Sequence, residues 1–129
     1  MRITHASLAV GALGLVALAI VGCGGDDATP TPEPAALVVD ATAAEGGGWA
    51  YDPSELTIPS EGSSTISLVN TDIVEHDLTI DELDFQIAVA VGETAEGTLT
   101  DVEPGTYRFY CTVPGHEANG MVGELVVTG

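Results

Sequence analysis

Short runs of β-branched and apolar residues, separated by turn residues, are the feature that most constrains the fold of this chain. They recur from residue 35 to the C-terminus, and no segment there keeps the period of an amphipathic helix. Turn residues separate the runs, as in residues 59–62 (PSEG) and 103–105 (EPG). The pattern predicts strands over residues 36–41, 55–58, 65–70, 77–80, 86–91, 97–100, 105–111 and 123–128. We therefore expect an all-β fold, a Greek-key β-sandwich of about eight strands, with helix confined to a turn or two near residues 83–85.

Aromatic residues indicate which side of the strands faces the core. In the strand predicted over residues 105–111, alternation places Tyr107, Phe109 and Cys111 on one side. Trp49 and Tyr51 lie before the second predicted strand. We favour a core position for both, and a patch near an early loop is the alternative.

The N-terminal segment differs from the rest of the chain. Arg2 precedes an apolar run over residues 6–21, which is shorter than the ~20 residues that a spanning helix needs. Residues 20–23 (IVGC) resemble the lipobox of bacterial and archaeal lipoproteins, where the signal is cut before a cysteine that carries a diacylglycerol. We expect a signal peptide over residues 1–22, and an uncleaved membrane anchor is the alternative. Lipidated Cys23 would then begin a Pro/Gly/Asp-rich linker over residues 23–35, ahead of a folded domain over residues 36–129.

Charge is the strongest compositional feature. The chain has 20 acidic residues, no lysine and only two arginines, Arg2 and Arg108, and its formal net charge is −18. All the acidic residues follow Cys23. This charge disfavours binding to nucleic acid or to an anionic membrane surface. It fits a basic protein partner or growth in high salt, and composition does not separate the two.

The second cysteine has no partner within the domain. With Cys23 assigned to lipidation, Cys111 is a free thiol outside the cytoplasm, where unprotected thiols become oxidised. Ligation of a metal ion would protect it. Cys111 belongs to a Cys-x4-His-x4-Met series with His116 and Met121, and His76 lies upstream at the start of a predicted strand. Two imidazoles and one thiolate, with a weak axial thioether, are the donors of blue-copper sites.

The local sequence agrees with this assignment. A strand that ends at Cys111 would aim the thiol inward, and the turn residues in loop 112–120 would bring the next two donors back to it. A dinuclear copper centre would need a second cysteine in the loop, and structural zinc would need a stronger fourth ligand than Met121. The chain has no His-x-His pairs of the kind that a multicopper oxidase uses. A Cys111–His116 protease pair is conceivable, but the axial methionine favours a metal.

These residues carry a family resemblance. Over about residues 56–127, and most densely in 70–80 (NTDIVEHDLTI) and 110–121, the chain resembles cupredoxins of the plastocyanin, halocyanin and auracyanin type. The resemblance implies one copper ion cycling between Cu(I) and Cu(II) in the domain of residues 36–129. His76 would bind through a ring nitrogen, Cys111 through sulfur, His116 as the ligand nearest solvent, and Met121 axially.

The resemblance also implies roles for residues around the ligands. In such proteins the backbone amide after the first histidine, here that of Asp77, donates to the cysteine sulfur. The side chain at this position ties the two ligand loops together, which makes Asp77 and Thr112 the expected outer residues. Asparagine is common where this chain has Asp77.

The expected function is electron transport by a protein that is not an enzyme. The carrier would be held to the membrane by lipidated Cys23, outside the cytoplasm, and would exchange electrons with redox proteins, including ones with a basic docking surface. Copper delivery or storage is the alternative, and a stalk or adhesion domain is a weaker one. Electrons would enter through the exposed edge of His116, within an apolar patch of four loop residues: Val113, Pro114, Ala118 and Gly120.

Overall fold

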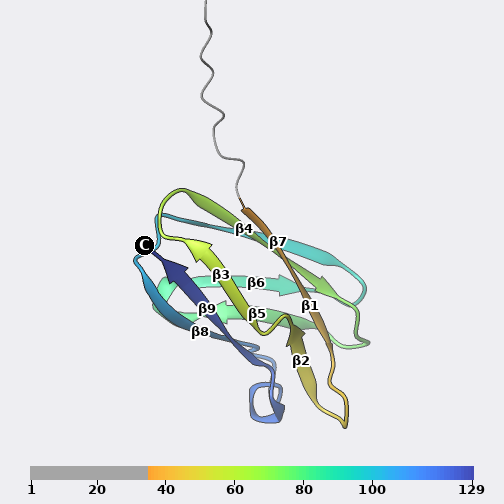
Figure 1. The fold of residues 1–129 in the computed structure, drawn as a ribbon. Helices are drawn as coiled ribbons and strands as arrows, with labels where there is room; N and C mark the ends of the chain where they lie inside the picture. Colours follow the sequence, from red (N-terminus) through yellow and green to blue (C-terminus); the bar gives the residue numbers. More distant parts are fainter. Residues whose placement is uncertain (1–34) are drawn as a thin grey trace, which may run out of the picture. The chain divides into compact units, whose positions relative to one another are not determined.

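The computed structural model describes residues 35–129, which form a two-layer β-sandwich (Figure 1). The strands are β1 (Ala35–Ala43), β2 (Trp49–Asp52), β3 (Glu55–Pro59), β4 (Ser63–Asn70), β5 (His76–Ile80), β6 (Phe85–Val89), β7 (Thr94–Thr100), β8 (Gly105–Tyr110) and β9 (Val122–Thr128). The predicted all-β sandwich is confirmed. The predicted signal peptide, Cys23 and nearly all of the linker lie outside the described residues.

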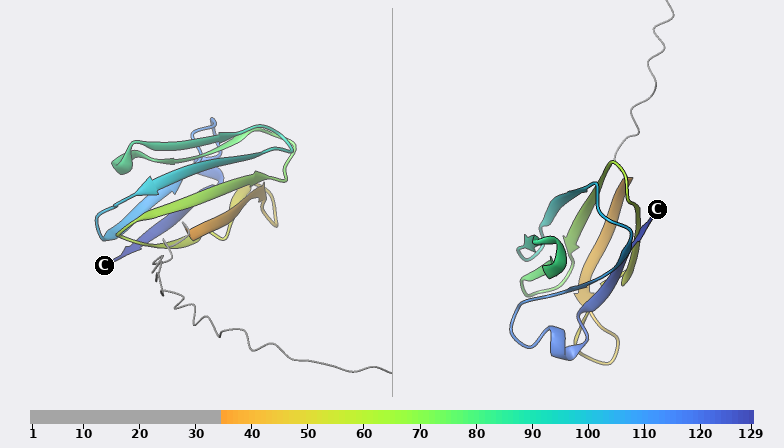
Figure 2. Two further views of the ribbon diagram at one scale, coloured as in Figure 1. Left: turned by 90° about the horizontal axis from the view of Figure 1, so that it is seen from above. Right: turned by 90° about the vertical axis from the view of Figure 1, so that its left-hand side faces the viewer.

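Each layer is a mixed sheet. One sheet has the strand order β2-β1-β4-β7 and the other has the order β3-β9-β8-β5-β6 (Figure 2). The pairs β1–β4 and β3–β9 are parallel, whereas the remaining neighbours are antiparallel. Strands that follow one another in the sequence therefore often belong to opposite sheets, as in a Greek-key sandwich.

The strands match the sequence-based prediction with one addition. All eight predicted strands are present, with ends that differ by a few residues, and β2 is a ninth that the prediction missed. β2 has only four residues, and it pairs antiparallel with the end of β1. The predicted helical turn is present slightly earlier than expected, as the 3₁₀ turn η1 (Asp81–Leu83), and η2 (Glu117–Asn119) is a second one. No helix among residues 35–129 is long and apolar enough to cross a membrane.

The core lies between the two sheets. Alternate residues face inward, so that in β3 Leu56 and Ile58 are buried between exposed neighbours. Phe109 of β8 is fully buried, and its ring lies over Gly123 of β9, where the Cβ of any other residue would collide with it. The predicted inward side of β8 is confirmed for Phe109 and for Cys111 just after the strand, while Tyr107 is only partly buried.

Three connections meet at one end of the sandwich. They are the β1–β2 turn, the β4–β5 loop over residues 71–75, and the β8–β9 loop that contains η2 (Figure 1). The backbone N–H of Thr71 donates to the carbonyl of Ala41 at 3.1 Å, which ties the β4–β5 loop to β1. The β1–β2 turn approaches the β8–β9 loop so closely that a Cβ on Gly48 would lie 2.6 Å from the carbonyl oxygen of Asn119. The predicted metal ligands lie at this end.

Candidate metal centre

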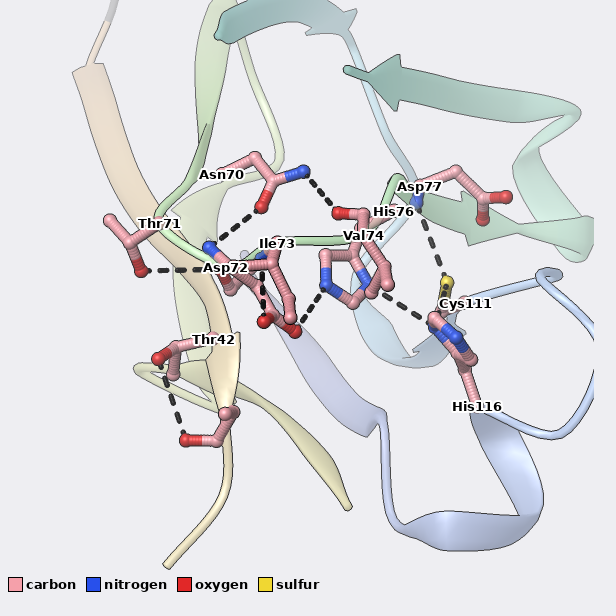
Figure 3. A network of polar contacts seen from close by, with 12 residues as sticks. Thr42, Asn70, Thr71, Asp72, Ile73, Val74, His76, Asp77, Cys111 and His116 are labelled. Atoms are coloured by element: carbon pink, nitrogen blue, oxygen red, sulfur yellow. Dashed lines mark hydrogen bonds and ion pairs between the residues drawn. The ribbon is translucent and has the colours of Figure 1, made fainter. Parts of the chain in front are cut away.

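Three predicted ligands converge in a buried cluster. The Nδ1 atoms of His76 and His116 are 3.2 Å apart, and the Sγ atom of Cys111 is 3.6 Å from Nδ1 of His116 (Figure 3). The donor atoms of all three residues lie within 4.8 Å of one another. Each residue is at most 4% exposed. The cluster is therefore a compact, water-excluded set of one sulfur and two nitrogen donors.

The strands and the ligand loop position these donors. His76 is the first residue of β5, and Cys111 follows the last residue of β8, the strand that pairs with β5. The backbone N–H groups of His116 and Met121 donate to the carbonyls of Val113 and His116, which folds the loop into tight turns. The N–H of Cys111 donates to the carbonyl of Met121 at 3.2 Å. The loop thus returns Met121, whose side chain is fully buried, to the neighbourhood of the thiol.

The donor set fits a type 1 copper centre. A thiolate and two imidazoles in a trigonal set, with a buried methionine close by, is the combination that distinguishes such a centre from structural zinc or from oxygen-rich sites. The two imidazoles point nitrogen atoms at each other, an arrangement that a metal ion between them would satisfy. The structure thus brings together His76, Cys111 and His116, and it places the predicted axial ligand beside them.

The protonation of the ligands follows from their burial. Desolvation raises the pKa of the Cys111 thiol, an effect that the backbone N–H groups of Asp77 and Val113 only partly offset. Burial, followed by the charge of His76, lowers the pKa of His116. Without metal, the thiol therefore keeps its proton and His116 is neutral at neutral pH.

Asp77 joins the two ligand segments, as expected. Its backbone N–H donates to Sγ of Cys111 at 3.5 Å (Figure 3). Its carboxylate accepts from both the backbone N–H of Thr112, at 2.9 Å, and the hydroxyl of Thr112, at 2.5 Å. The hydroxyl of Tyr51, which is buried in the core as predicted, donates to the backbone carbonyl of Asp77. The aspartate therefore forms the tie that an asparagine side chain would make, and it adds a buried negative charge.

Asp72 is a residue of the site that the sequence prediction missed. Its Oδ2 atom accepts a hydrogen bond from Nε2 of His76 at 3.1 Å, so Nδ1 of that ring is left as the metal-facing nitrogen. The carboxylate is held in turn by the backbone N–H of Ile73, while Asn70 binds the loop at both ends (Figure 3). The Ile73 N–H and then His76 lower the pKa of Asp72. The contact depends on how the β4–β5 loop folds. Nothing in the local sequence marks Asp72 as a partner of His76, so the sequence analysis did not predict it.

Trp49 is the second missed residue. Its indole lies parallel to the imidazole of His116, with ring centroids 3.8 Å apart and an interplanar angle of 15°. Trp49 packs against the edge of the core, but it is only partly buried, so the predicted core position applies fully to Tyr51 alone. The sequence offered one clue to this position, namely that Trp49 directly follows a glycine at the start of β2.

The expected exposed edge of His116 needs correction. The residue is only 4% exposed, little more than the 2% of His76, because the indole covers the face of its ring. In the predicted apolar patch, Val113 is partly buried and three residues are exposed: Pro114, Ala118 and Gly120.

A β-sandwich with Cys, two His and Met at one end defines a small copper-binding module. The chain belongs to the cupredoxin-like domain family, whose model matches residues 13–127. Plastocyanin from Synechococcus sp. strain JA-2-3B'a(2-13) is 34% identical over 91 residues, which span 61% of this chain and 64% of that relative, just under two thirds of its length.

Solved structures show the same fold. Auracyanin A, a "blue" copper protein from Chloroflexus aurantiacus, matches with a TM-score of 0.61 and 27% identity, over 74% of this chain and all of that one. The copper nitrite reductase of Nitrosomonas europaea matches in fold, with a TM-score of 0.60 and 22% identity, over 74% of this chain and 41% of the reductase.

Proposed function

We propose that this protein is a mononuclear type 1 copper electron carrier, which moves single electrons between redox proteins outside the cytoplasm. The observation that carries the proposal is the convergence of Sγ of Cys111 with the Nδ1 atoms of His76 and His116 in a buried cluster. The likeness of the chain to plastocyanin and to a blue copper auracyanin supports the same function.

Bound copper supplies a one-electron couple, and the protein supplies a fixed and dry set of donors. The Cys111–Met121 backbone bond and the Asp77–Thr112 tie hold the ligand loop in place. Burial of His76, Cys111 and His116 excludes water and would shield a bound copper ion from a substrate. A carrier needs this rigidity, whereas copper enzymes need access to the metal, so we propose that the protein is not an enzyme.

The place of action follows from the N-terminal sequence. Lipidated Cys23 would hold the carrier at the membrane surface, with residues 23–35 as a spacer. Replacement by Cys23→Ser should move the protein from the membrane fraction to the soluble extracytoplasmic fraction. Retention of this variant in the membrane would instead favour an uncleaved anchor.

The test of the function is the visible spectrum of the protein loaded with Cu(II). Thiolate-to-copper charge transfer should give an intense blue colour that reduction removes and oxidation restores. The variant Cys111→Ser should be colourless, while Cys23→Ser, which changes the other cysteine, should remain blue. A colourless wild-type adduct that exchanges copper rapidly with chelators would contradict electron carriage and favour copper delivery or storage.

A further inference from the structure

Trp49 stacks directly on one of the predicted metal ligands, His116, and neither the ligand set nor the predicted patch includes it. We propose that Trp49 is the group through which electrons enter and leave the centre, so that a redox partner docks on its indole instead of on the imidazole of His116. This proposal rests on the proposed function, and it identifies the part of the surface that a partner must contact.

The stacked geometry supports this role. Ring centroids 3.8 Å apart at an angle of 15° place the indole in van der Waals contact with the imidazole over the ring face. Electronic coupling between donor and acceptor falls steeply with their separation, so a ring in contact with a ligand extends that ligand towards the surface. His116 in turn lies beside the Cys111 sulfur. The structure therefore contains an unbroken series of contacts from Trp49 to the metal donors.

The backbone fixes Trp49 in this position. Gly48, directly before it, has φ +99°, and a Cβ there would lie 2.6 Å from the Asn119 carbonyl oxygen. The N–H of Ala44 donates to the carbonyl of Gly48 at 3.1 Å, which closes the turn that leads into β2. The β1–β2 turn is therefore packed directly on the ligand loop, and Trp49 is held over His116 by the backbone on both sides.

The exposure of the Trp49 indole and of the His116 imidazole indicates which of the two rings a partner contacts. His116 is only 4% exposed and offers a partner very little contact surface, whereas Trp49 is partly exposed. Ile73, on the neighbouring β4–β5 loop, is a large apolar residue that is 87% exposed. Two exposed carboxylates, Glu45 and Glu75, lie on the connections that form this end, and a third, Glu117, is paired with Arg108. This surface fits a redox protein with an apolar contact patch that is ringed by basic side chains.

The transfer is a simple one-electron step. The reduced partner loses one electron, the Cu(II) centre becomes Cu(I), and an oxidised acceptor later removes that electron from the same surface. No bond is formed or broken in Trp49, and no proton leaves it, since the indole only mediates the coupling.

The experiment compares electron self-exchange between the Cu(I) and Cu(II) forms of full-length variants, measured by NMR line broadening at high salt. Trp49→Leu and Trp49→Met remove the aromatic ring, and methionine is the more adaptable filler if leucine disturbs the fold. Trp49→Phe keeps a stacked ring. We expect the two non-aromatic variants to exchange slower by an order of magnitude or more, and Trp49→Phe to stay within a few-fold of wild type. The blue absorption band and the reduction potential should stay close to wild type.

The control is Tyr107→Leu, which removes an aromatic ring from β8 far along the strand from the ligand loop and should leave the exchange rate unchanged. Non-aromatic variants that exchange as fast as wild type, or faster, would overturn the proposal, because the indole would then shield His116 instead of connecting it. A wild-type protein that is not blue would refute the proposed function itself, which is a separate outcome.

Discussion

Single residues around the ligands set the character of this site. His76 and Cys111 are each bonded to an aspartate, His76 through its ring nitrogen to Asp72 and Cys111 through the backbone of Asp77. Two carboxylates close to one centre place negative charge where the protein excludes water, and that charge stabilises the more positive oxidation state. Neither residue is an expected metal ligand, yet both would act on the properties of a bound metal.

Asp72→Asn tests the first of these residues. Asparagine keeps the size of the side chain but removes the charge, so we expect copper affinity to fall by about 10- to 100-fold. The reduction potential should rise, because Cu(II) loses more stabilisation than Cu(I). Competition with a chelator and a redox titration would measure the two effects. Asp84→Asn, at an exposed aspartate, is the matched control, and equal behaviour of the two variants would show that Asp72 has no such role.

Proton release on copper binding tests the protonation of the ligands. Since burial raises the pKa of Cys111, the thiol is protonated in the metal-free protein up to and beyond its ordinary pKa, and copper must displace this proton. His116, whose pKa is lowered, has no proton to lose at pH values above neutrality. Copper affinity should therefore increase with pH. Calorimetry in buffers of different ionisation enthalpy should detect proton release in wild type and not in Cys111→Ser, and binding without release would contradict the assignment.

At the scale of elements, the strands and the ligand loop could be predicted, and the packing of loops could not. Strand alternation and turn residues are local signals, and so is the Cys-x4-His-x4-Met series. β2 was missed because its four residues are too few to show a period. Asp72 and Trp49 were missed for a related reason, since their contacts depend on how three connections fold onto one another. The exposure of His116 was misjudged because the covering residue comes from the strand that was missed.

Gly48→Ala tests the packing of the β1–β2 turn on the ligand loop. The added methyl would meet the carbonyl of Asn119, so we expect a loss of about 1–3 kcal/mol in the free energy of unfolding from this collision. Gly46→Ala is a close control, because Gly46 also has a positive φ of +91° but has open space around it. Urea unfolding of the metal-free proteins would give both values. Equal losses in the two variants would mean that backbone strain alone, and not the contact with the ligand loop, explains the effect.

At the scale of the whole molecule, charge dominates. Against 20 acidic residues the chain has only two arginines, and the guanidinium of Arg108 is already paired with Glu117 at 2.7 Å. Such a surface attracts positively charged partners over long range and repels anionic ones. Since Glu45 and Glu75 are exposed on two connections at the ligand end, part of this charge lies near the proposed docking surface.

Ionic strength tests the effect of this charge on electron transfer. Reduction of the copper-loaded protein by a basic c-type cytochrome should become slower as salt is added, because screening weakens the attraction. Reduction by the anion ferrocyanide should become faster under the same conditions. If both rates are indifferent to salt, steering by the acidic surface has no part in the function.

A crystal structure of the copper-loaded protein would test the assignment of the metal centre without relying on its colour. Anomalous scattering at the copper edge should locate one ion bound by Nδ1 of His76, Nδ1 of His116 and Sγ of Cys111, with Met121 beside it and Trp49 still stacked on His116. Copper bound at surface carboxylates, or bound without Cys111, would contradict the assignment of this site.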